Sequence, residues 1–320
     1  AWPMFSASNI HYELSERTHA IHYGGIGLVH KLAQEIGLID AIDRKLHLLK
    51  IHVPYHESDH VLNIAYNALC EGRCLEDIEL RRNDETFLNA LETERIPDPT
   101  TEGDFCRRFR TPYHIGRLQD AIDEARLNVW AKQPTKFFER AIIDMDGHLI
   151  GTTGQCKKGM DIAYDGTWGY HALVVSLANT NEVLSLVNRS GNRPSHEGAA
   201  AQCDRGIALC RRAGFRSILL RGDTDFSQTE HLDRWDADNV VFHFGYDATT
   251  NLKAIAENLP KNAWKRLKRP PKYEVKTRRR RRPDNVKEAI VKRREYENQI
   301  LQYEEVAEFR YRPTACKQSY

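Results

Sequence analysis

Hydrophobic residues recur at helical spacing through the first 135 residues of the chain. Three segments show this spacing, and each predicts an amphipathic helix. The predicted apolar stripes consist of Leu28, Leu32, Ile36 and Ile39; of Val61, Ile64, Ala65 and Leu69; and of Leu118, Ile122, Ala125 and Val129. Gly72 is a stop signal for the second helix. Thr101, three residues before Asp104, predicts a capping box that opens a further helix. We therefore expect residues 1–135 to form a mainly helical region.

From about Lys136 the pattern changes to short apolar runs that are typical of strands. Strands are predicted in "FFERAIIDMD", on both sides of a turn at 179–182, and at 217–220 and 240–244. Helices are predicted at 195–213, where Gly214 follows, and at 227–237. This order predicts a mixed α/β sheet with one antiparallel hairpin and later parallel strands. We expect residues 136–245 to form this core.

Positive charge is concentrated in one segment beyond the core. The net charge of the chain is only +2, yet residues 261–282 contain twelve Lys and Arg residues and a single acidic residue, Glu274. The segment is too charged and too rich in proline to be buried. Such a density of positive charge indicates a polyanionic partner. We expect residues 246–320 to form a basic insertion subdomain.

Composition narrows the class of protein. Apolar residues make up 41% of the 320 residues, and no run approaches the roughly 18 apolar residues that indicate a membrane span. No export leader is evident, and seven cysteines without CxxC pairing favour reduced thiols in the cytoplasm. The chain begins without Met and stops at "RPTACKQSY", so we expect a fragment of a longer reading frame.

Carboxylates stand where two predicted strands end. Asp144 and Asp146 are two residues apart in one strand, which places both on the same face, and Asp223 directly follows the strand at 217–220. If the two strands are neighbours, Asp146 and Asp223 converge and repel each other, unless a divalent cation lies between them. Oxygen ligands suit Mg²⁺ or Mn²⁺. The alternative is that Asp223 or Asp225 simply caps the following helix.

Several motifs resemble one family. The stretches "GMDIAYDGTWGYHALVVSLANT", "LVNRSGNRPSHEGAA" and "LRGDTDFS" occur in the order found in the catalytic domain of bacterial insertion-sequence DDE transposases, and the likeness covers about 139–320. It implies a ribonuclease-H-like fold and metal-assisted cleavage and transfer of DNA strands at the inverted-repeat ends of the element. A truncated remnant that binds DNA without cutting it is the alternative.

The resemblance also assigns residues. The first catalytic acid matches Asp146, with Asp144 as the alternative because His148 stands where Thr is commoner. The second matches Asp223, and these acids would bind Mg²⁺ or Mn²⁺. The family adds a Glu on a later helix. Glu297 follows Arg293 at the family spacing, but Ile290 and Glu304 replace the expected Tyr and Lys, so we expect this Glu beyond Tyr320.

Two basic segments are candidates for DNA contact. The loop "NRSGNRPSHEG" precedes a helix N-terminus, which attracts phosphate, and the insertion contains the arginine run. The predicted DNA-binding residues are Arg189, Arg193, Lys265, Arg266, Arg278, Arg279 and Arg280. By resemblance, the partners are double-stranded inverted-repeat and target DNA and a second copy of the chain, a homodimer in a synaptic complex. The resemblance also implies that the helical residues 1–135 bind DNA or assemble this complex.

Two further groups of residues have open interpretations. Trp168, Tyr170 and His171 either stack on a base or pack in the core, and the core is the expected place. The histidines His52, His56 and His60, with Cys70 and Cys74 beyond, have spacing compatible with zinc. Pro54 would break a helix through His52, so we expect a polar surface there instead.

Overall fold

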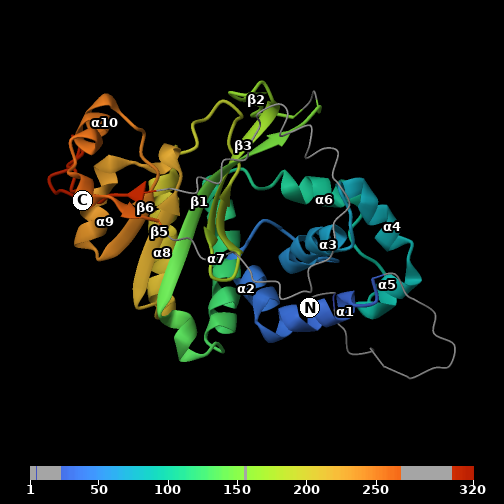
Figure 1. Ribbon diagram of the computed structural model, residues 1–320. Coiled ribbons are helices and arrows are strands. Elements are labelled where there is room, and N and C mark those ends of the chain that lie inside the picture. Colours follow the sequence, from blue (N-terminus) through green and yellow to red (C-terminus); the bar gives the residue numbers. More distant parts are fainter. Residues whose placement is uncertain (1–4, 6–22, 155–156, 268–304) are drawn as a thin grey trace, which may run out of the picture.

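The computed structural model describes residue 5 and residues 23–154, 157–267 and 305–320. The N-terminal part is helical, as predicted. Its elements are α1 (Ile26–Glu35), α2 (Leu38–Lys45), α3 (Glu57–Leu69), η1 (Leu75–Asp77), α4 (Ile78–Arg82), α5 (Glu85–Ala90), α6 (Pro99–Cys106), α7 (Pro112–Trp130) and η2 (Thr135–Phe138). Figure 1 shows α1 to α6 to the right of the sheet, with α9 (Leu232–Ala237) and α10 (Thr250–Glu257) at the opposite, left-hand end of the molecule.

The predicted mixed sheet is confirmed. Its strands are β1 (Arg140–Gly151), β2 (Asp161–Ile162), β3 (Trp168–Leu177), β4 (Glu182–Val187), β5 (Ser217–Gly222) and β6 (Val240–Phe244). β1, β3 and β4 are antiparallel neighbours, β5 lies parallel to β1 on its other side, and β6 lies parallel to β5. β1 continues to Gly151, so Asp144 and Asp146 lie within this strand and not at its end as predicted. The carboxyl end of β5 adjoins this middle part of β1, which is the condition for their acidic residues to meet.

Helix α8 (Ala199–Ala213) covers one face of this sheet. Alternate residues of β1 point into the core beneath it: Ile143 and Met145 are buried, and the Met145 sulfur contacts that of Cys203 on α8. Asp144 and Asp146, which alternate with these two residues along β1, therefore lie on the opposite face of the sheet. The predicted helix and its end at Gly214, which adopts a left-handed conformation (φ 98°), are confirmed.

The faces predicted for the N-terminal helices are partly wrong. Leu28 and Leu32 of α1 are 52% and 55% exposed, whereas His30 is fully buried and its Nδ1 lies 2.8 Å from the Tyr66 hydroxyl. A polar side chain that has a hydrogen-bond partner in the interior is thus buried, while apolar residues of the same helix are exposed. The predicted single helix through Ile39 is also divided at Gly37, whose φ of 74° ends α1 and permits the turn into α2.

The cap of α6 differs from the prediction as well. Asp98, and not Thr101, is the N-cap residue: its carboxylate accepts hydrogen bonds from the backbone N–H groups of Thr100 and Thr101 at 2.8 and 2.9 Å. Pro99 occupies the first helical position, where its missing N–H costs nothing. The helix therefore begins three residues earlier than the Thr101 box implied.

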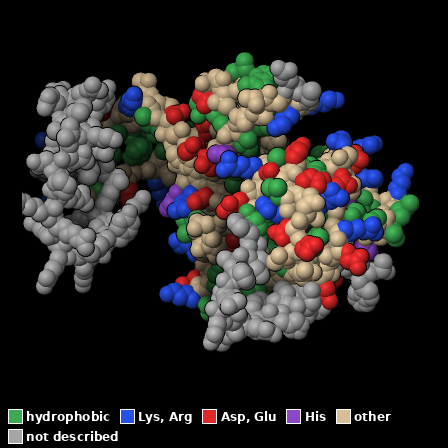
Figure 2. Space-filling model, turned by 90° about the vertical axis from the view of Figure 1, so that its right-hand side faces the viewer, with side chains coloured by type: hydrophobic (Ala, Val, Ile, Leu, Met, Phe, Trp, Pro, Cys, Tyr) green, Lys and Arg blue, Asp and Glu red, His purple; other side chains and the backbone are tan. Residues whose placement is uncertain are grey.

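Helix α7 joins the helical region to the core. It packs against α2 on one side and α8 on the other. Arg126 donates to Glu182 and to the Val183 carbonyl on β4 at 3.0 and 2.6 Å, and Trp130 belongs to the core beneath the sheet. Figure 2, seen from the side of the helical region, shows Lys and Arg side chains interspersed with Asp and Glu. No helix of the described residues is long and apolar enough to cross a bilayer.

Beyond the sheet, the described part of the predicted insertion is small. The strands β7 (Lys265–Arg266) and β8 (Glu305–Val306) form a two-stranded sheet, preceded by η5 (Lys261–Ala263). Lys265 and Arg266 are exposed there, and Arg278, Arg279 and Arg280 lie outside the described residues. The last residues return to the core: Cys316 is buried there, and the Tyr320 hydroxyl donates to Asp233 of α9 at 2.5 Å.

Candidate functional site

The carboxylates of β1 and of the turn after β5 meet where β5 ends beside β1. Asp144 is paired in register with Arg221; Asp146 stands two residues further along β1, and Asp223 stands two residues after Arg221, just beyond the end of β5. Both line a single open depression of about 360 Å³, the acidic pocket, together with Asp144, Met145, Arg221 and Gly222. The structure therefore brings together the three carboxylates on which the sequence-based hypothesis depends.

Asp144 is already neutralised by a cation of the chain. Arg221 forms a bidentate pair with it: Nε and Nη2 donate hydrogen bonds to the two Asp144 carboxylate oxygens, at 2.6 Å each. This hydrogen bonding raises the pKa of the Arg221 guanidinium, and a bidentate pair of this kind fixes the orientation of both side chains. Arg221 was not among the predicted site residues. Its position immediately before "GDTD" was visible, but its partner becomes evident only once β1 and β5 are known to be neighbours.

Asp146 has no such partner. Its side chain is exposed, and it forms no hydrogen bond or ion pair with another described residue. It points to the same face as Asp144 because the two are separated by one residue of an alternating strand. Of the two candidates for the first acid, Asp146 is thus the one whose oxygens are available to a ligand.

Asp223 stands in a tight turn after β5. Its Oδ1 accepts the backbone N–H of Asp225 at 2.9 Å, which caps the short η3 (Thr224–Phe226). Gly245, after β6, approaches this turn closely: a Cβ there would lie 2.7 Å from the Thr224 nitrogen. The capping alternative therefore holds for Asp223, but the cap occupies one oxygen only, and the exposed carboxylate still faces the acidic pocket.

The donor set of the acidic pocket suits a hard cation. Asp146 and Asp223 offer carboxylate oxygens and no sulfur or imidazole, the ligand type of Mg²⁺ and Mn²⁺. Two exposed carboxylates in one pocket repel each other, and a cation would relieve that repulsion. No group of three or more His, Cys, Asp or Glu residues arranged to hold a metal occurs within the described parts of the chain. The pocket thus supplies part of a coordination shell.

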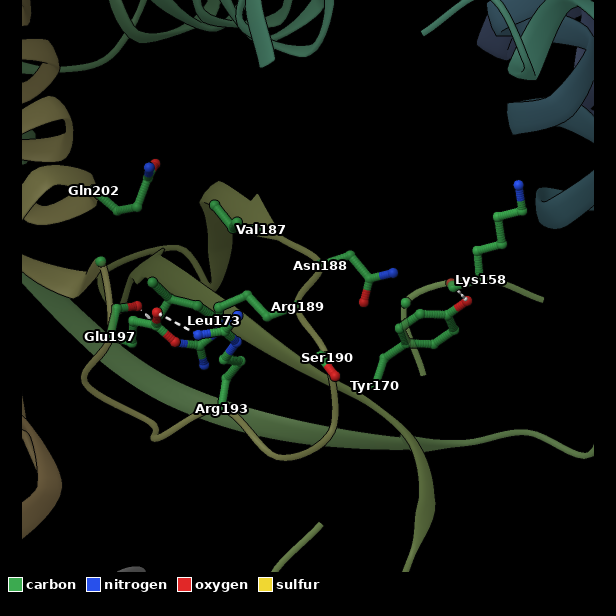
Figure 3. Close-up of a pocket in the computed structure, with 12 residues that line it drawn as sticks. Lys158, Tyr170, Leu173, Val187, Asn188, Arg189, Ser190, Arg193, Glu197 and Gln202 are labelled. Carbon is green, nitrogen blue, oxygen red and sulfur yellow. Dashed lines mark hydrogen bonds and ion pairs between the residues drawn. The ribbon is translucent and has the colours of Figure 1, made fainter. Parts of the chain in front are cut away.

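The predicted phosphate loop forms a second hollow, the loop pocket, of about 580 Å³. Figure 3 shows Arg189, Arg193 and Glu197 close together, while Lys158 and Gln202, which also line the pocket, lie at opposite sides of the view. Arg189 donates to the carbonyls of His171, Pro194, Ser195 and Glu197 at 2.7 to 3.1 Å. The Arg189 guanidinium therefore stabilises the conformation of the loop. Arg193 is exposed and pairs with Glu197 at 3.1 Å.

Arg189→Ala is expected to loosen the loop at 190–198 and to lower the free energy of unfolding by about 2–6 kcal/mol, since four hydrogen bonds worth about 0.5–1.5 kcal/mol each disappear. Arg193→Ala in the same loop should change it by less than about 1 kcal/mol, because exposed ion pairs contribute little. Urea titration and amide hydrogen exchange measure both effects. Equal losses in the two variants would contradict this role of Arg189.

The remaining candidates are dispersed. Trp168 is 47% exposed and His171 is buried, with its Nδ1 2.7 Å from the Arg193 carbonyl, so the core prediction holds for His171 alone. The rings of His52 and His56 stack with their centroids 5.6 Å apart. His60 is buried with its Nδ1 3.2 Å from Glu102, so the predicted polar surface is wrong for His60. The six described cysteines are free thiols.

Comparison with known proteins finds a matching family and a similar solved structure. A family model described as transposase DDE domain group 1 matches residues 19–307. Among solved structures, the piggyBac transposase in its synaptic complex with hairpin DNA is similar, with a TM-score of 0.37 and 11% identity. That alignment covers 75% of this chain and 54% of the piggyBac chain, so this chain spans about half the length of that protein. No curated protein matches the sequence.

Proposed function

Since this chain belongs to the transposase DDE domain group 1 family, we propose that it cuts and joins DNA at the inverted-repeat ends of an insertion sequence with the help of a divalent cation. The observation that carries this proposal is the meeting of Asp146 and Asp223 in the acidic pocket. We further propose that the sheet is a ribonuclease-H-like core. The antiparallel order of β1, β3 and β4, followed by parallel β5 and β6, supports this assignment.

In this proposal Asp146 and Asp223 bind the cation, and Asp144 does not. The two ligands are exposed and line the same pocket, one from β1 and one from the turn after β5, whereas both oxygens of Asp144 are occupied by Arg221. When bound, the cation would activate an attacking oxygen and stabilise the leaving oxygen of the phosphodiester. The chain itself fixes the two ligands: the register of β1 with β5 sets their spacing, and the Asp225 N–H orients the Asp223 carboxylate.

The family pattern adds a Glu to these two acids. Glu297, the candidate in this sequence, lies outside the described residues. We propose inverted-repeat and target DNA as partners, with two copies of the chain in a synaptic complex. Lys265 and Arg193, both exposed, remain candidate contacts with DNA. For Arg189 we propose a different role, the support of the loop.

Asp223→Asn tests the proposal. It is expected to lower Mg²⁺-dependent nicking of inverted-repeat DNA by about 10²-fold or more, because a neutral amide is a weaker ligand and several kcal/mol of transition-state stabilisation depend on the ion. Asp225→Asn, two residues away, should nick within about threefold of the wild type. Gel assays of nicking and binding give both readouts. DNA binding without any nicking by the wild type would favour the alternative, a protein that binds DNA without cutting it.

A further inference from the structure

We infer that the helical region carries a second binding surface for DNA, at the corner between α6 and α7. This inference rests on the proposed function, which makes DNA the partner. The loop after α2 and the α6–α7 connection enclose a hollow of about 510 Å³, the corner pocket. Its lining includes four cations and two histidines, namely Lys50, Arg107, Arg108, Arg110, His47 and His114.

Positive charge exceeds negative charge in this pocket. Asp104 is the acidic residue among its lining residues, and it pairs with Arg107 at 2.6 Å. The side chains of Lys50 and Arg110 are exposed and form no ion pair or hydrogen bond with another described residue. Elsewhere on this side, cations and carboxylates are interspersed (Figure 2). A concave site with uncompensated cations attracts a polyanion.

The corner pocket is held in shape by buried contacts. Glu57, only 1% exposed, accepts hydrogen bonds from the backbone N–H groups of Leu48 and Leu49 at 2.9 Å, and so fixes the loop that presents Lys50. Arg108 donates to the Leu48 carbonyl at 3.3 Å, which ties the α6 side of the pocket to that loop. The backbone that carries these cations is therefore fixed before DNA binds, and binding would order only their side chains.

The polar groups of the pocket also suit phosphate. Helix α7, 19 residues long, begins here with no acidic residue in its first turn and no side-chain cap on its N-terminus. Pro112 at its start has no N–H, and the His114 N–H donates to the Thr111 carbonyl at 3.1 Å, so it is the positive end of the helix dipole that favours an anion here. The Nδ1 atom of His114, in this first turn, is buried without a hydrogen-bond partner. Together with Lys50 and Arg110, these groups match the oxygens of a phosphodiester backbone.

Helix α7 also relates the corner pocket to the catalytic core. Gln119 donates to the Leu186 carbonyl on β4 at 3.5 Å, and His114 lies one to two turns earlier on the helix, about 7.5 Å along its axis. β4 leads directly into Asn188 of the loop pocket. The two pockets therefore lie towards the same end of α7, and one duplex crossing that end could meet both.

The test is the salt dependence of binding to inverted-repeat duplex DNA. Each phosphate contact contributes about −0.9 to the slope of log K against log salt concentration. The double variant Lys50→Ala with Arg110→Ala is expected to show a slope shallower by about 2 and weaker binding at every salt concentration. The matched control is Lys31→Ala with Arg73→Ala, which removes two exposed cations of the helical region that do not line the pocket; its slope should equal that of the wild type.

The outcomes separate this inference from the proposed function. An unchanged slope in the pocket variant, or an equal change in the control, would overturn the inference. If the inference fails in this way but the wild type nicks DNA and Asp223→Asn does not, the proposed function is still supported. A shallower slope confined to the pocket variant supports the corner surface, even where no nicking is seen. Circular dichroism of each variant shows whether the fold is retained.

Discussion

Asp146→Asn is expected to lower the rate of Mg²⁺-dependent DNA nicking by about 10³-fold or more. Asp146 is the carboxylate of β1 that no described residue neutralises, and it shares the acidic pocket with Asp223. Its loss removes a ligand of the proposed cation, which is worth several kcal/mol in the transition state. About 4 kcal/mol corresponds to this thousandfold loss. Single-turnover nicking of labelled inverted-repeat DNA measures it.

Asp144→Asn, the same substitution two residues away, is the matched control. It keeps the shape of the side chain but weakens the pair with Arg221, and we expect a loss of nicking of about tenfold or less. Binding of Mn²⁺, followed by electron paramagnetic resonance, gives a readout independent of activity: Asp146→Asn should bind more weakly and Asp144→Asn much like the wild type. The reverse order would make Asp144 the ligand and Asp146 its neighbour.

Most of the sheet was predictable because β1, β3, β4, β5 and β6 each carry a local signal, whereas the two-residue β2 was not predicted. The apolar run at 217–220 and the turn at 179–182 mark β5 and the β3–β4 hairpin without knowledge of the rest of the chain. The convergence of Asp146 and Asp223 followed from one further assumption, that their strands are neighbours. The ion pair of Arg221 with Asp144 depends on the parallel register of β1 with β5, which no local pattern specifies.

The helical region was less predictable because polar residues occupy much of its interior. Leu28 and Leu32 fit a helical period yet are exposed, while His60, Asn63 and Glu102 are at most 3% exposed. A periodicity argument assumes that buried positions are apolar. That assumption fails where buried polar groups satisfy one another, because the cost of their burial is then offset by hydrogen bonds. Such partners are far apart in the sequence, so the pattern cannot reveal them.

Glu102→Ala is expected to lower the free energy of unfolding by about 3–5 kcal/mol. The Glu102 carboxylate is fully buried, accepts a hydrogen bond from Asn63 at 2.7 Å and lies 3.2 Å from Nδ1 of His60. Removing it leaves two buried polar groups without their partner, a loss of the size seen when a buried pair is broken. Urea titration measures this loss. Glu94→Ala, at an exposed position nearby, should stay within about 0.5 kcal/mol of the wild type.

The same carboxylate predicts a dependence on pH. Burial raises the pKa of Glu102, although hydrogen bonds from His60 and Asn63 oppose this effect. A carboxyl whose pKa is higher in the folded chain binds a proton more tightly there. Its contribution to stability is therefore complete below the unfolded pKa and is lost as the pH rises through the folded one. Glu102→Gln, which is neutral at every pH, removes this dependence. The wild type should thus gain stability relative to Glu102→Gln as the pH falls below neutrality, and a constant difference between the two across that range would show that the Glu102 carboxyl titrates alike in the folded and unfolded chains.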